Sequence, residues 1–164
     1  MFLNPDVTLI QDNTVEELYR FLSLSPKDVK IVGVNTHSSW DHGNKIPILL
    51  QRMGFSLCTS IKNIQEVARV QGSFFMMDKQ LFDFLWGFDE KYFLYKEEED
   101  LQLRVRLLGN KILYNPHVEV DHIWWVTTSH IRNKIKLKSD FYFIKKWLFF
   151  WKKSKDELFS SKKK

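Results

Sequence analysis

Segments with the pattern of buried strands alternate along this chain with segments that have the periodicity of helices. The expected strands are residues 29–34, 67–77, 111–114 and 118–122, and the expected helices are residues 14–24, 78–85, 101–108 and 129–151. Because a sheet needs helices to cover its apolar faces, this alternation favours an α/β fold with a layered sheet. The 164 residues are enough for one domain with its own core.

The positive charge of the chain is concentrated near its C-terminus. Residues 132–164 contain 12 of the 25 Lys and Arg but only three of the 20 Asp and Glu, so the preceding part is slightly acidic. Within this segment, residues 141–153 mix aromatic rings with lysines, which is typical of a helix lying on an anionic membrane surface. A helix that packs its rings on the domain and turns its lysines outward has the same composition.

The sequence gives two further indications of compartment and partner. Cys58 is the single cysteine, which excludes an intramolecular disulfide and favours a cytoplasmic protein, peripheral to the inner face of the cell membrane if the C-terminal helix binds it. A basic segment rich in aromatic rings is also found in nucleic-acid binders. Nucleic acid is the less favoured partner, because the positive charge is confined to one end and the acidic residues elsewhere would repel phosphate.

Four consecutive carboxylates at residues 97–100 follow an aromatic loop and open an expected helix. The helix dipole stabilises acidic residues in a first turn, so a solvated helix start explains part of this run. Adjacent like charges raise the pKa of one or more of the carboxyls toward values useful for a general base. Asp100 lies four residues before Arg104 and is expected to pair with it, which leaves Glu97 or Glu98 available.

Three other positions could serve a ligand. Asp6 lies on a turn after a short apolar strand, and a carboxylate at the edge of a sheet can hold Mg²⁺ or Mn²⁺. His122 ends an expected strand and could provide an imidazole ligand. Gly72 permits a close approach of the backbone. Each position also has a structural interpretation: an Asn-Pro turn, a packed histidine and a β-bulge.

Taken in order, these segments resemble family 2 glycosyltransferases with the GT-A fold, and especially their rhamnosyltransferase-like members. The matching segments are residues 3–7 (Leu-Asn-Pro-Asp-Val) for the metal-binding motif, residues 70–77 and 86–93 for the acceptor side, residues 97–101 for the catalytic base, and His122 for a late metal-binding histidine. The resemblance covers residues 1–129, the C-terminal part of the family's catalytic domain. Residues 130–164 form a separate basic, aromatic helix and tail.

The resemblance implies an inverting transfer of a sugar from a UDP- or dTDP-linked donor to a saccharide or lipid-linked saccharide acceptor, as in cell-surface polysaccharide synthesis. It implies that Asp6 and His122 hold Mn²⁺ or Mg²⁺. Glu98 takes the position of the catalytic base, with Glu97 or Asp100 as possible contributors. The acceptor side would be lined by Gly72, Ser73, Trp86 and Gly87.

The chain departs from the family pattern at three points. Glu98 stands where the family more often has Asp, and Asn4 replaces the first acid of the metal motif. The family's nucleotide-binding strands precede that motif and have no counterpart here, so an incomplete, N-terminally truncated GT-A domain is expected. The alternatives are an inactive fragment or interaction module that needs a partner half, and a nucleic-acid binder that uses the basic tail. The sequence leaves the sugar, the nucleotide and the acceptor open.

Overall fold

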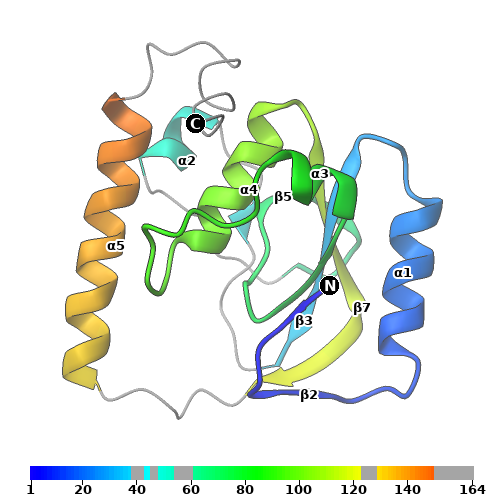
Figure 1. The fold of residues 1–164 in the computed structure, drawn as a ribbon. Coiled ribbons are helices and arrows are strands. Elements are labelled where there is room, and N and C mark those ends of the chain that lie inside the picture. Colours follow the sequence, from blue (N-terminus) through cyan, green and yellow to red (C-terminus); the bar gives the residue numbers. More distant parts are fainter. Residues whose placement is uncertain (38–42, 45–47, 54–60, 123–128, 150–164) are drawn as a thin grey trace.

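The computed structural model describes residues 1–37, 43–44, 48–53, 61–122 and 129–149 (Figure 1). These residues form a mixed α/β fold, which confirms the expected fold class. The strands are β1 (Phe2–Leu3), β2 (Val7–Leu9), β3 (Val29–Thr36), β4 (Gly43–Asn44), β5 (Gln65–Arg69), β6 (Phe74–Met77) and β7 (Lys111–His122). The helices are α1 (Thr14–Leu24), α2 (Ile48–Arg52), α3 (Lys79–Phe84), α4 (Glu97–Leu107) and α5 (Ser129–Phe149).

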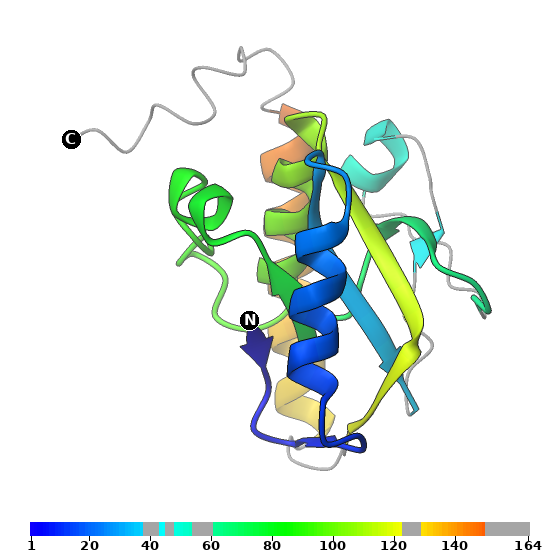
Figure 2. The same cartoon turned by 90° about the vertical axis from the view of Figure 1, so that its right-hand side faces the viewer.

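The strands form one seven-stranded sheet in the order β1-β6-β3-β7-β5-β4, and β2 pairs with the far end of β7. Side chains alternate between the two faces of β3, so Val32 packs with α1 on one face and Ile31 packs with α4 on the other. Figures 1 and 2 show the resulting layers, from α1 through the sheet and α4 to α5. Helix α5 is therefore the outermost layer on the α4 side.

Residues 67–77 were expected to form one strand interrupted at Gly72, and the structure corrects this prediction. The segment forms two strands, β5 and β6, and β3 and β7 lie between them in the sheet. Residues 70–73 cross the sheet between the two strands. Gly33 makes this crossing possible, because a Cβ atom built on it would lie 2.3 Å from Cβ of Val70.

The strand expected to stop at Pro116 continues through it as β7. The register between β3 and β7 shifts at this point, and the extra residues accommodate the proline, which has no N–H to donate to a ladder. Asn115 Oδ1 accepts a 3.0 Å hydrogen bond from the backbone N–H of His117 within this bulge. The continued strand carries His122 to the edge of the sheet, where it lies opposite Val7 of β2.

Helix α5 matches the expected helix over residues 129–149, and residues 150–164 lie outside the described part of the chain. Phe143 and Trp147 on its inner face are fully buried and pack with Leu103 of α4 and with Tyr92. The inner face therefore agrees with one of the two interpretations of this segment, the one in which its aromatic rings pack on the domain. None of the described helices is long and apolar enough to cross a membrane.

Candidate functional site

Strand pairing brings Asp6 and His122 together, although they are far apart in the sequence. Asp6 lies on the turn before β2, and β2 pairs with the last residues of β7. Asp6 Oδ2 lies 3.2 Å from His122 Nε2, with the His122 side chain buried and that of Asp6 partly exposed. The structure thus places the two expected metal ligands side by side at one edge of the sheet.

Gln71 orients the imidazole of His122, and no local pattern singles this residue out. Its Nε2 lies 3.4 Å from His122 Nδ1, and its Oε1 accepts a hydrogen bond from the hydroxyl of Thr36. The polar chain therefore runs from Thr36 through Gln71 and His122 to Asp6.

The two residues after Gln71, Gly72 and Ser73, connect the Asp6–His122 pair to Glu98 at the start of α4. A Cβ atom built on Gly72 would lie 2.7 Å from Cγ of Glu98, so the absence of a side chain makes room for the glutamate. The carbonyl of Ser73 accepts a 2.8 Å hydrogen bond from the backbone N–H of Asn4, on the turn that carries Asp6. Residues 71–73 thus contact the Asp6–His122 side with one residue and the acidic start of α4 with the next.

Gln102 fixes α4 in this position. Its amide pairs with both backbone groups of Val70, because Val70 N donates to Oε1 at 2.7 Å and Nε2 donates to Val70 O at 2.9 Å. Gln102 is fully buried and lies one turn after Glu98 on the same helix. A glutamine between two leucines gives no signal in the sequence, yet this double hydrogen bond holds the helix that carries Glu98 against Val70.

The four adjacent carboxylates have different surroundings. Asp100 accepts a 2.9 Å hydrogen bond from Nε of Arg104, which confirms the pairing expected from their spacing. Glu99 lies 2.8 Å from Lys96 Nζ and 3.5 Å from Arg69 Nη1, so its charge is balanced by two cations. Within the described ranges Glu97 and Glu98 form no ion pair, which distinguishes them from the other two carboxylates.

Burial and mutual repulsion keep Glu97 and Glu98 from ionising together. Burial is the largest cause of the raised pKa of Glu98, and the charges of Glu97 and Glu99 add to it, so that the pKa reaches about 8. Burial also raises the pKa of Glu97, whereas a hydrogen bond with Glu98 lowers it. Oε2 of each glutamate and Oγ of Ser73 are buried and have no hydrogen-bond partner among the described residues.

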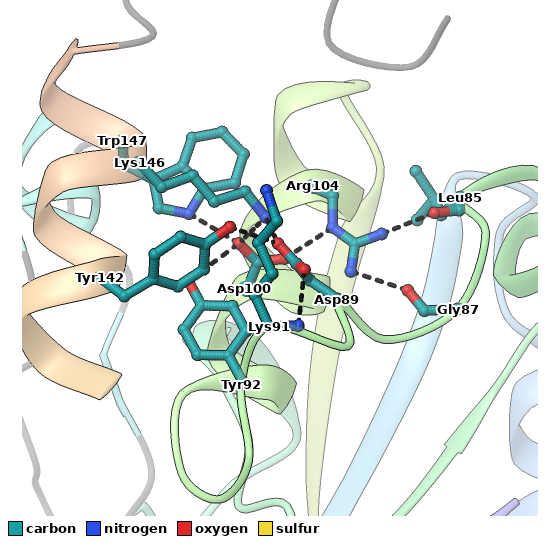
Figure 3. A network of polar contacts seen from close by, with 10 residues as sticks. All are labelled: Leu85, Gly87, Asp89, Lys91, Tyr92, Asp100, Arg104, Tyr142, Lys146 and Trp147. Atoms are coloured by element: carbon teal, nitrogen blue, oxygen red, sulfur yellow. Dashed lines mark hydrogen bonds and ion pairs between the residues drawn. The ribbon is translucent and has the colours of Figure 1, made fainter. Parts of the chain in front are cut away.

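Asp100, the other acidic residue considered as a base, belongs to a buried polar network that attaches α5 to the domain (Figure 3). Its side chain is fully buried, and Oδ1 accepts a 2.9 Å hydrogen bond from Nε1 of Trp147 and lies 2.6 Å from Lys146 Nζ. Lys146 also lies 2.7 Å from Asp89 Oδ2, on the aromatic loop. These contacts occupy the carboxylate of Asp100 and leave it poorly placed to take a proton from a substrate.

Trp86 and Gly87 lie on the loop that follows α3, with φ angles of 63° and 68°. Half of the Trp86 side chain is exposed. Arg104 links this loop to α4, because its guanidinium donates to the carbonyls of Leu85 at 2.7 Å and Gly87 at 2.8 Å. The loop is thus held to α4, the helix that carries Glu98, through Arg104, which also pairs with Asp100.

The metal ion expected from the sequence would be held by Asp6 and His122. In the described ranges, no group of three or more His, Cys, Asp or Glu side chains could hold a metal ion. Asp6 and His122 offer two ligands, and their 3.2 Å separation is close to the roughly 2.9 Å between neighbouring ligands of octahedral Mg²⁺. The pair fits a divalent cation that takes its other ligands from water or from a phosphate-bearing substrate.

A comparison with models of known protein families finds no match to this chain, and a comparison with curated proteins finds none either. A functional assignment therefore depends on the residues of the site and their arrangement.

Proposed function

We propose that this chain is part of an inverting glycosyltransferase with a GT-A fold, which transfers a sugar from a UDP- or dTDP-linked donor to a saccharide or lipid-linked acceptor. One observation carries the proposal: residues 71–73 join a carboxylate–imidazole pair suited to a cation with a partly buried glutamate suited to act as a base. The chemistry of such a transfer needs both groups close to one substrate. The single cysteine supports a cytoplasmic location.

Glu98 is the base in this proposal. Its carboxylate removes the proton from the attacking hydroxyl of the acceptor while that oxygen forms a bond to the anomeric carbon. The bond from that carbon to the diphosphate breaks at the same time, and the nucleoside diphosphate leaves. A pKa raised to about 8 makes the ionised carboxylate a stronger base than an ordinary glutamate. We therefore expect the reaction rate to rise with pH as Glu98 ionises.

Asp6 and His122 would hold Mn²⁺ or Mg²⁺ against the diphosphate of the donor. The cation, when bound, offsets the negative charge that develops on the leaving group. Gln71 contributes by holding the ring of His122 in a fixed orientation. Gly72 and Ser73 would border the acceptor, because Gly72 lies directly against Glu98 and the hydroxyl of Ser73 is left without a partner in the described part of the chain.

Thermal unfolding of the whole chain tests the donor site. The unfolding midpoint is measured without ligand, with Mn²⁺, and with Mn²⁺ plus UDP or dTDP. A ligand at about 100 times its dissociation constant stabilises the fold by about 2.7 kcal/mol, which raises the midpoint by roughly 5–10 °C in a chain of this length. The nucleotide-dependent shift should disappear in Asp6→Ala and persist in Asp12→Ala, an exposed carboxylate on the neighbouring loop.

A second measurement separates binding from chemistry. Glu98→Gln should keep the nucleotide-dependent shift but lose turnover of a labelled nucleotide-sugar donor. A cooperatively folded chain that shows no shift with either nucleotide would contradict the proposal and would favour an interaction module. A shift that survives in Asp6→Ala would contradict the assignment of the cation site.

A further inference from the structure

Helix α5 carries a second apolar face on the side turned away from the domain. Leu137 and Phe141 are 71% and 68% exposed, and Ile144 and Leu148 are also exposed. The four residues are separated by four, three and four positions, so they form one stripe along the helix. Exposed apolar stripes of this kind are uncommon on a soluble surface and mark a site of interaction.

Lysines flank this stripe. At about 100° per residue, Lys134, Lys138 and Lys145 follow it on one side, and all three are exposed. The one acidic residue in the described part of α5, Asp140, is turned toward the domain, where it lies 3.5 Å from Lys96. The outer face of α5 is therefore apolar at its centre and positive along one margin.

The inner face of the helix is fixed to the domain, so the stripe is held outward. Trp147 and Lys146 bind Asp100, and Ser139 donates a 2.7 Å hydrogen bond to the carbonyl of Leu94. These contacts span two turns of α5 and anchor it against the aromatic loop and α4. Because α5 is the outermost layer (Figure 1), its outer face is turned away from the sheet.

We propose that the outer face of α5 binds the surface of an anionic lipid bilayer, with the four apolar side chains inserted at the headgroup boundary and the lysines facing the lipid phosphates. A helix with this division lies in the plane of the interface. A second copy of the chain is disfavoured, because two such faces would bring their lysines together. A nucleic acid would pair with the lysines but leave the apolar stripe exposed. The inference does not depend on the proposed transfer reaction.

Flotation of the whole chain with lipid vesicles tests this surface. Vesicles of phosphatidylcholine alone are compared with vesicles that contain 30% phosphatidylglycerol. We expect binding to the anionic vesicles that weakens with added salt. Leu137→Ser with Phe141→Ser should lower the partition coefficient roughly 100-fold, since each large apolar side chain contributes about tenfold or more. Changing Lys134, Lys138 and Lys145 to Gln should lower it about fivefold per lysine.

Tyr19→Ser with Leu24→Ser provides a matched control, because both side chains are exposed apolar groups on α1 at the other side of the molecule. This variant should bind vesicles as the unchanged chain does, and all variants should keep the same unfolding midpoint. Equal binding of the α5 and α1 variants would overturn the proposal. Loss of a dimer in the α5 variant, with no vesicle binding by the unchanged chain, would identify a second copy as the occupant and would also overturn it.

Discussion

The close contact between Gly72 and Glu98 gives the sharpest test of the site geometry. In Gly72→Ala the new Cβ would lie 2.7 Å from Cγ of Glu98, whereas an ordinary contact begins near 3.4 Å. The helix cannot simply retreat by this 0.7 Å, because Gln102 holds it to Val70 with two hydrogen bonds. Overpacking of this kind costs about 1–3 kcal/mol, and we expect Gly72→Ala to destabilise the fold by that amount.

The origin of this cost is tested by removing the partner. In a Glu98→Ala background the nearest remaining atom of residue 98 is Cβ, at 3.2 Å, so most of the clash is gone. There Gly72→Ala should be close to neutral, because the clash that remains is offset by the lower entropy of the unfolded chain, worth about 0.4–1 kcal/mol. The coupling energy between the two positions, from urea unfolding of the four proteins, should reach about 1–3 kcal/mol.

Gly109→Ala serves as the control for this cycle. Gly109 has a φ of 82° and no neighbouring atom within 4 Å of a built Cβ, so its replacement strains the backbone without a clash. A left-handed residue other than glycine costs about 1–2 kcal/mol, and this cost should be the same with or without Glu98. Additive effects of Gly72→Ala and Glu98→Ala would refute the proposed contact.

Three further predictions concern charge and metal binding. The folded state keeps the proton of Glu98 up to a pH near 8, whereas the unfolded chain loses it near pH 4.5. The free energy of unfolding should therefore fall as pH rises through this window. Urea unfolding at several pH values should show that Glu98→Gln removes up to about 1.4 kcal/mol per pH unit of this slope. Lys146→Met leaves Asp100 and Asp89 without their shared cation and should lower the free energy of unfolding by on the order of 3 kcal/mol. Lys145→Met, on the exposed face, should change it by less than about 0.5 kcal/mol. Equal effects of the two variants in thermal unfolding would contradict the role of the network. Gln71→Leu should lower the affinity for Mn²⁺ by about 10–100-fold in calorimetry, and an unchanged affinity would show that Gln71 does not orient the imidazole.

Local patterns in the sequence predicted the elements that depend on nearby residues. The apolar run of β3 and the start of α3 at Asp78, whose Oδ1 accepts a 2.8 Å hydrogen bond from the backbone N–H of Leu81, are examples. The pairing of Asp100 with Arg104 also follows from a spacing of four residues on one helix. In each case the partners lie within one turn or one strand, so periodicity and capping rules are enough.

The contacts that assemble the site join residues far apart in the chain, and no local pattern announces them. Gln102 and Val70 are separated by 32 residues, and Gln71 and His122 by 51. Continuation of β7 through Pro116 was missed for a related reason, since a proline stops a strand unless a bulge relieves it, and the bulge depends on pairing with β3. The ion pair between Glu99 and Arg69 of β5 is likewise not announced by a local pattern, because 30 residues separate the two.

Because residues 71–73 are adjacent in the chain and contact both His122 and Glu98, cation binding at one side of the site would be linked to proton binding at the other. Gln71 touches the imidazole and Gly72 touches the glutamate, so a cation held by His122 would act on the proton of Glu98 across two adjacent residues. Thermodynamic reciprocity requires the converse: any cation that makes Glu98 release its proton more readily must itself bind more tightly once that proton has left. The part of the pH dependence of cation affinity that Glu98→Gln removes would therefore report the ionisation of a residue that the cation never touches.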